Sequence, residues 1–121
     1  MKREYVIVDS SVNYGSILNR YICVDTQILG EVAEVFRYYK DRLLLIQERV
    51  LTVPHMYYDN YKKEGFNEKT KNVTAIKLLD TNNTRFYCQE KKSKDGTFLI
   101  ICGAVFNKKS EKNNKTKQIN L

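Results

Sequence analysis

Residues 73–117 constrain the fold of this chain more than any other stretch, because they hold apolar runs separated by turn residues. Residues 84–91 (TRFYCQEK) alternate polar and apolar side chains, and residues 97–106 (TFLIICGAVF) are almost continuously apolar. The Lys-Asp-Gly sequence at 94–96 is typical of a hairpin turn, since glycine readily adopts positive φ. We therefore predict a three-stranded antiparallel meander whose last strand leads into a lysine-rich tail.

The segment from Asp25 onward has the pattern of an amphipathic helix, with apolar residues at three- and four-residue spacing. The apolar stripe consists of Ile28, Val32, Val35, Phe36, Tyr39, Leu43, Ile46 and Val50. Asp25 or Thr26 can cap its start. The stripe fits either one long helix or a helical pair broken near residues 40–41. Because Pro54 disfavours the helical conformation at the residue before it, the helix should end at Val53.

The remaining segments give shorter signals. Residues 4–9 are typical of a strand, and residues 10–15 have the composition of a turn. Residues 16–24 fit a helix or a strand. Residues 55–64 favour one or two helical turns ended by Gly65, followed by a polar loop.

The order of these elements predicts the fold class. At 121 residues the chain fits one domain, 1–121, with residues 106–121 as a basic C-terminal tail. We predict an α+β domain: an antiparallel meander of three to four strands with one or two amphipathic helices packed on one face. The other face should be open to solvent. Because the chain has no apolar run of the ~18 residues that span a membrane and no signal-peptide pattern, we expect a cytoplasmic protein without membrane attachment.

The positive charge is concentrated in the second half of the chain. Residues 1–53 carry seven basic and seven acidic side chains, whereas residues 54–121 carry fourteen basic and seven acidic ones, which accounts for the net +7. This asymmetry is typical of proteins that bind a polyanion or an acidic partner. A lysine surplus that only improves solubility gives the same composition.

The sequence holds few residues of other reactive types. Cys23, Cys88 and Cys102 are far apart and odd in number, so we expect buried free thiols, with no disulfide framework, metal site or cofactor. His55 is the only histidine, and either a general base or a structural role fits it.

Alternation along the predicted strand at 84–91 separates its side chains into two faces. Phe86 and Cys88 share one face, which we expect against the helices, and Arg85 and Tyr87 share the other. Lys77 lies on the same face as Arg85 and Tyr87 only if the residue numbers of paired positions in the preceding hairpin add up to an even number. A three-residue loop would set Lys77 opposite Tyr87, and a four-residue loop would send it to the other face. The sequence leaves both registers open.

Three short motifs in this order resemble the RelE/HigB superfamily of bacterial toxins. They are Lys77-Leu78-Leu79, Thr84-Arg85-Phe86-Tyr87, and Phe106-Asn107-Lys108-Lys109 with Lys112. The resemblance implies a compact sheet with two helices on one face, and a toxin that is neutralised by a co-expressed antitoxin. It also implies cleavage of mRNA on the ribosome, by attack of the RNA 2′-OH on the adjacent phosphate. Such a reaction needs orientation and charge stabilisation rather than a metal.

On this resemblance the catalytic residues would be Arg85, Tyr87, Lys108 and Lys109. Arg85 would hold the scissile phosphate, Tyr87 would orient the nucleophile or stack on a base, and the two lysines would neutralise developing charge. The residues that contact RNA phosphates would be Lys77, Lys112, Lys115 and Lys117. Two alternatives remain open: a non-catalytic module that binds nucleic acid or an acidic partner, and a gyrase poison like the ParE branch of the superfamily. A third is an unrelated basic domain.

Overall fold

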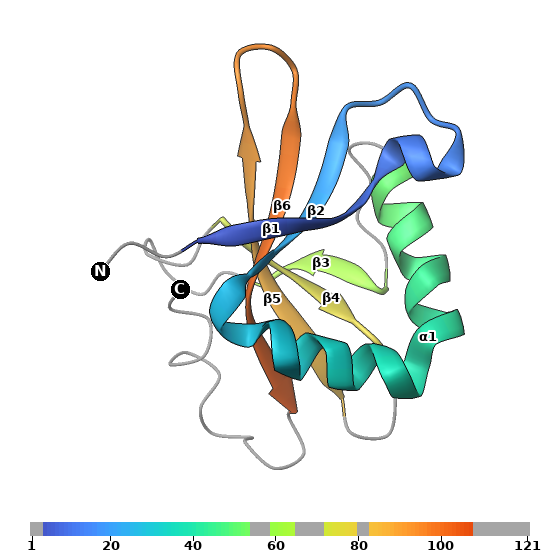
Figure 1. Cartoon of the computed structure of the whole chain (residues 1–121), viewed down its shortest axis with the longest axis vertical. Coiled ribbons are helices and arrows are strands. Elements are labelled where there is room, and N and C mark those ends of the chain that lie inside the picture. The colour runs from blue at the N-terminus through green and yellow to red at the C-terminus, as the bar shows by residue number, and fades with distance from the viewer. Residues whose placement is uncertain (1–3, 54–58, 65–71, 80–82, 108–121) are drawn as a thin grey trace.

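The computed structural model describes residues 4–53, 59–64, 72–79 and 83–107, which form a twisted sheet with a long bent helix on one face (Figure 1). The strands are β1 (Tyr5–Ser10), β2 (Arg20–Asp25), β3 (Tyr61–Lys63), β4 (Val73–Lys77), β5 (Thr84–Lys92) and β6 (Phe98–Asn107). The helix is α1 (Leu29–Thr52), and two short 3₁₀ turns, η1 (Ser11–Tyr14) and η2 (Thr26–Ile28), lie before it.

The six strands form one mixed sheet in the order β1-β2-β6-β5-β4-β3. The predicted meander is present as β4, β5 and β6, which pair antiparallel. However, β2 pairs with β6 in parallel, from Arg20 opposite Phe98 to Val24 opposite Cys102. The prediction of an antiparallel sheet of three to four strands is therefore wrong. The physical reason lies in β6, whose nearly continuous apolar run is typical of a central strand paired along both edges.

The turn between β5 and β6 has the predicted chemistry. Gly96 has a φ of +91°, the conformation in which glycine is favoured. The backbone N–H of Thr97 donates to the Asp95 carboxylate at 3.0 Å, and the Ser93 hydroxyl also donates to it. These bonds lower the pKa of Asp95 to about 2. The hairpin is thus closed by local residues, which is why the sequence predicted it.

Helix α1 is continuous in sequence but bends sharply at Tyr39, where φ is −125° and ψ is 32°. The bend lies next to residues 40–41, where the sequence allowed a break, and its two halves follow different directions over the sheet (Figure 1). The Asp25 carboxylate caps η2 by accepting from the Gln27 N–H at 2.8 Å. The helix ends at Thr52, and Val53 is extended, as Pro54 predicted.

The main core lies between α1 and the sheet, where Phe86 and Cys88 point as predicted. A smaller apolar cluster of Val73, Ala75, Tyr87 and Phe106 lies on the opposite face. Tyr87 and Phe106 are only 0% and 3% exposed, so the expected open face is closed at this point.

A register shift separates the pair Tyr87–Ala104 from the pair Cys88–Cys102, so that Gly103 forms a bulge between them. This bulge reverses the alternation along β6, so Cys102 packs in the main core while Phe106 packs in the cluster on the opposite face.

The prediction of helical turns at 55–64 is also wrong where the structure describes these residues. Tyr61 begins strand β3, and its buried side chain belongs to the main core.

Candidate functional site

Lys77 and Arg85, two of the predicted site residues, lie directly opposite each other on β4 and β5. Lys77 and Arg85 therefore lie on the same face of the sheet, which is one of the two registers that the sequence left open. The partner of Lys77 is Arg85, however, and not Tyr87 as a three-residue loop would have set it. Both side chains bind one carboxylate, that of Glu64. Its Oε1 is 2.7 Å from Arg85 Nη1, and its Oε2 is 3.1 Å from Lys77 Nζ.

This ion-pair cluster of Glu64, Lys77 and Arg85 is largely removed from water. The exposed fractions of the three side chains are 9%, 15% and 11%. Like charges directly across two strands repel each other, and the shared carboxylate offsets that repulsion. The cluster has two positive charges and one negative charge, so its formal charge is +1.

Tyr87 lies on the same face as this cluster, but the structure gives its hydroxyl little freedom to act. The hydroxyl is buried, and none of the described residues forms a hydrogen bond with it. The ring lies against Phe106, with the ring centroids 6.0 Å apart. Burial raises the pKa of Tyr87, and the nearby Arg85 guanidinium opposes part of that rise. In this conformation the phenol is a packed core group.

The other predicted site residues, Lys108, Lys109, Lys112, Lys115 and Lys117, lie outside the described residues, as does His55. Their roles remain predictions from the sequence. Of the predicted site, the structure therefore brings together Lys77, Arg85 and the neighbouring Tyr87.

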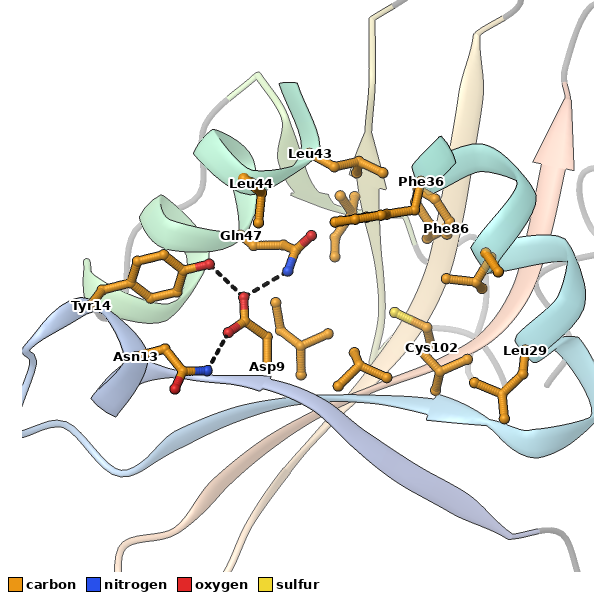
Figure 2. A pocket seen from close by; sticks show the side chains of 16 residues that line it. Asp9, Asn13, Tyr14, Leu29, Phe36, Leu43, Leu44, Gln47, Phe86 and Cys102 are labelled. Atoms are coloured by element: carbon orange, nitrogen blue, oxygen red, sulfur yellow. Dashed lines mark hydrogen bonds between the residues drawn. The ribbon is translucent and has the colours of Figure 1, made fainter. Parts of the chain in front are cut away.

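A second site, which the sequence did not predict, is a pocket of about 560 Å³ between α1 and the sheet. Its walls are mostly apolar and come from β1, η1, β2, α1, β4, β5 and β6. Both halves of the bent helix contribute: Phe36 lies before the bend at Tyr39, and Leu43 lies after it (Figure 2). Phe86 and Cys102 contribute from the sheet. Leu29 and Ala33, which also line the pocket, are partly exposed to solvent and form its rim.

One end of the pocket is polar and is organised by Asp9, which is only 6% exposed. Its Oδ1 accepts hydrogen bonds from the Ser10 N–H and from Asn13 Nδ2, both at 2.9 Å. Its Oδ2 accepts from the Tyr14 hydroxyl and from Gln47 Nε2, both at 2.6 Å. Figure 2 shows the three side chains converging on the carboxylate from η1 and α1. We call these residues the Asp9 corner.

Local backbone geometry explains why Asp9 points into the pocket. The pairing of β1 with β2 shifts between Ile7 and Asp9, so the bulge sets Asp9 opposite the core residue Ile22. The 3₁₀ turn η1 then returns Asn13 and Tyr14 toward the same carboxylate, and Gly15 ends the turn with a φ of +75°.

The Asp9 corner also changes the chemistry of Tyr14. Burial, the hydrogen bond to Asp9 and the negative charge of that carboxylate all raise the pKa of Tyr14. The phenol therefore stays protonated and keeps donating to Asp9 at any ordinary pH.

The sequence carries a signal for the local part of the Asp9 corner only. The aspartate directly after the apolar run at 5–8 is unusual for a strand and is followed by the polar residues Asn13 and Tyr14. The fourth donor, Gln47, comes from a helix 38 positions further on. No local pattern indicates that contact.

The three cysteines are free and buried, as predicted from their spacing. Cys88 and Cys102 are cross-strand partners, with their sulfur atoms 2.7 Å apart, and burial raises the pKa of Cys88. Within the described ranges, no three metal-binding side chains gather into one group.

Comparisons with protein-family models, with curated proteins and with solved structures found no match to this chain. Among the described residues, no helix is long and apolar enough to cross a membrane.

Proposed function

We propose that this protein binds a small, mostly apolar molecule in the pocket between α1 and the sheet. The observation that carries the proposal is the pocket itself, an apolar space of about 560 Å³ with one preorganised polar corner. Small-molecule sites in proteins have this character: a few hundred Å³, apolar walls and a small number of fixed polar groups.

Ordinary packing does not account for such a space. Protein interiors are packed as densely as organic crystals, and voids larger than a water molecule are few. Apolar walls that face unfilled space also lack the van der Waals contacts that a packed core makes. A ligand that fills the pocket would restore those contacts and stabilise the folded state in proportion to its concentration.

A fluorescent probe tests this function directly. N-phenyl-naphthylamine is apolar and brightens when it leaves water, so we expect a saturable fluorescence increase with the wild-type protein. Val32→Phe adds volume to the helix side of the pocket and should weaken binding about tenfold, since overpacking a filled site costs about 1–3 kcal/mol. Leu45→Phe is the matched control, because Leu45 is on the same helix, is 70% exposed and does not line the pocket.

The two variants separate pocket binding from adsorption to the surface. Binding that Val32→Phe and Leu45→Phe weaken equally would contradict the proposal, as would the absence of any saturable signal in the wild type. A melting temperature that rises with probe concentration gives an independent measurement.

Ribosome-dependent mRNA cleavage by a cytoplasmic toxin that a partner antitoxin neutralises is our second proposal, and it no longer depends on a RelE-like fold. It is supported by Lys77 and Arg85 lying directly opposite each other with a net charge of +1 around Glu64. Two adjacent cations are a suitable arrangement for stabilising the charge that develops on a phosphate.

Induced expression in bacteria tests this second function. We expect growth arrest and cuts in translated mRNA, both removed by Arg85→Ala, with a loss of about 10²–10³ in cleavage rate, as for the loss of other charge-stabilising donors. Arg37→Ala is the control, because Arg37 lies on the exposed side of α1. Unchanged arrest in Arg85→Ala would overturn the proposal, and RNA binding without cuts would favour the non-catalytic alternative.

A further inference from the structure

We infer that the pocket selects a neutral or positively charged ligand that carries an N–H or O–H donor, and that it excludes anions. The inference rests on the proposed binding function and names the chemical class of its ligand. It follows from the way in which the Asp9 carboxylate is satisfied.

The charge of the pocket is set by Asp9. The four hydrogen bonds to its carboxylate come from one backbone N–H, two side-chain amides and one phenol, all of which are neutral. Among the described residues that line the pocket, Asp9 is the one acidic side chain, and no lysine, arginine or histidine is present. This lining contrasts with a chain whose net charge is +7. The negative charge of Asp9 is therefore stabilised by hydrogen bonds but is not cancelled.

The surroundings strengthen the effect of that charge. Asp9 is 6% exposed, and the pocket beside it has apolar walls, so water screens the carboxylate weakly. Charges interact more strongly where the effective dielectric constant is low. An anionic ligand would meet repulsion and lose its own hydration, whereas a neutral ligand would not and a cation would be attracted.

The directions of the hydrogen bonds at the Asp9 corner also affect which ligand fits. Gln47 donates one amide hydrogen to Asp9, which fixes the orientation of its amide. Its carbonyl oxygen is consequently turned away from Asp9 and toward the interior of the pocket (Figure 2). The Tyr14 hydroxyl also uses its hydrogen on Asp9, so only its acceptor lone pairs remain for a ligand. The corner therefore offers two acceptors, the Gln47 carbonyl and the Tyr14 hydroxyl, beside the one remaining amide hydrogen of Gln47, and this balance favours a ligand that supplies a donor.

The apolar walls of the pocket affect which ligand body fits. Phe36 and Phe86 contribute aromatic rings to the wall, and Leu43 contributes an aliphatic side chain. Such walls favour a flat or branched apolar group. An aromatic amine or a hydrophobic alcohol satisfies all three conditions.

A set of three related probes tests the inference in the wild-type protein. N-phenyl-naphthylamine has an apolar body and one N–H donor. Anilinonaphthalene sulfonate shares that skeleton and adds a negative charge, and N-methyl-N-phenyl-naphthylamine lacks the donor. We expect the sulfonate to bind at least about tenfold more weakly than the amine because of charge repulsion. The N-methyl probe should bind roughly fivefold more weakly because it loses one hydrogen bond.

Two variants assign the selectivity to its cause. Asp9→Asn removes the charge with little change in shape, and should bring the affinity for the sulfonate close to that for the amine. Asp95→Asn is the control, because it removes an exposed carboxylate in the turn between β5 and β6 and should leave the affinity ratio unchanged. Circular dichroism establishes that each variant is folded.

The possible results distinguish this inference from the function on which it rests. If none of the three probes binds, the proposed function fails. If the neutral amine binds but the sulfonate binds as tightly in the wild type, the function stands and the charge selectivity is overturned. If the N-methyl probe binds as tightly as the amine, the requirement for a donor is overturned. The wild-type comparison alone gives these results, even if Asp9→Asn does not fold.

Discussion

Asp9 and Glu64 are two nearly buried carboxylates that the fold satisfies in opposite ways. Asp9 accepts four hydrogen bonds from neutral groups on the helix side of the sheet. Glu64 binds two cations, Lys77 and Arg85, near the other end of the sheet. The first carboxylate borders a pocket of about 560 Å³, and the second lies in an ion-pair cluster that is largely removed from water.

The difference shows that hydrogen bonds from neutral groups and ion pairs have different consequences for a buried carboxylate. Hydrogen bonds from neutral donors remove most of the cost of burying Asp9 but leave its negative charge able to act on a ligand. The cations around Glu64 cancel its charge, so that this carboxylate stabilises two neighbouring strands instead. On the proposed function, the same type of side chain would support ligand binding at one site and stability at the other.

Removing the Glu64 carboxylate should have the largest effect on stability. Glu64→Ala leaves Lys77 and Arg85 directly opposite each other with little access to water, and we expect unfolding free energy to fall by about 3 kcal/mol or more. Urea denaturation measures the change. Lys77→Met is the control: it preserves the pair of Glu64 with Arg85, so its cost should be well under half as large. Equal costs for the two variants would mean that the cluster does not depend on the shared carboxylate.

Asp9→Ala should have the next largest effect, about 2 kcal/mol, because it leaves four donors without their acceptor. Water can enter the pocket and replace part of those bonds, which is why the expected loss is smaller than for Glu64. Asp9→Asn keeps one acceptor oxygen and should lose about half as much. Denaturation curves in urea give both values. If Asp9→Ala costs more than Glu64→Ala, the pocket is drier than its partly exposed rim indicates.

Local patterns in the sequence predicted the parts of the fold that local interactions determine. The turn at 94–96, the strands on either side of it and the end of the helix before Pro54 are examples, since each depends on residues within a few positions of one another. The prediction that Phe86 and Cys88 lie on the side of β5 that faces the helix was also correct. Alternation within a single strand is sufficient for that prediction.

The parts that were missed depend on contacts between distant residues. The parallel pairing of Arg20 with Phe98 joins segments that are 78 positions apart, and the segment at 16–24 alone fits a helix or a strand. The Gly103 bulge changes which residues of β6 face the helix, and nothing in the alternation predicts its place. At the candidate sites, the sequence could place Lys77 and Arg85 on one face. It could not identify Glu64 as their shared partner, or Gln47 as a partner of Asp9.

Tyr14→Phe tests how far the corner depends on a protonated phenol. At neutral pH it should cost about 1 kcal/mol, the usual value of one buried hydrogen bond. The pH dependence is a sharper test. Because the pKa of Tyr14 is raised in the folded state, the unfolded chain loses this proton first, and wild-type stability should fall as pH rises above about 10. Thermal unfolding between neutral and alkaline pH should show a shallower fall in Tyr14→Phe. Identical slopes would mean that the phenol is not held by Asp9.

Tyr87→Phe should have the smallest effect, and it separates packing from chemistry on the side of the ion-pair cluster. The Tyr87 hydroxyl is buried and has no hydrogen-bond partner in the part of the chain that the structure describes. Its removal should therefore leave stability unchanged or raise it slightly, within about 0.5 kcal/mol. Tyr61→Phe is the matched control. Tyr61 is equally buried, but its hydroxyl donates to Glu90 and accepts from Thr74, so we expect a loss of about 1 kcal/mol. If Tyr87→Phe also loses about 1 kcal/mol, the Tyr87 hydroxyl is hydrogen-bonded in solution, and the phenol is then more than a packed core group.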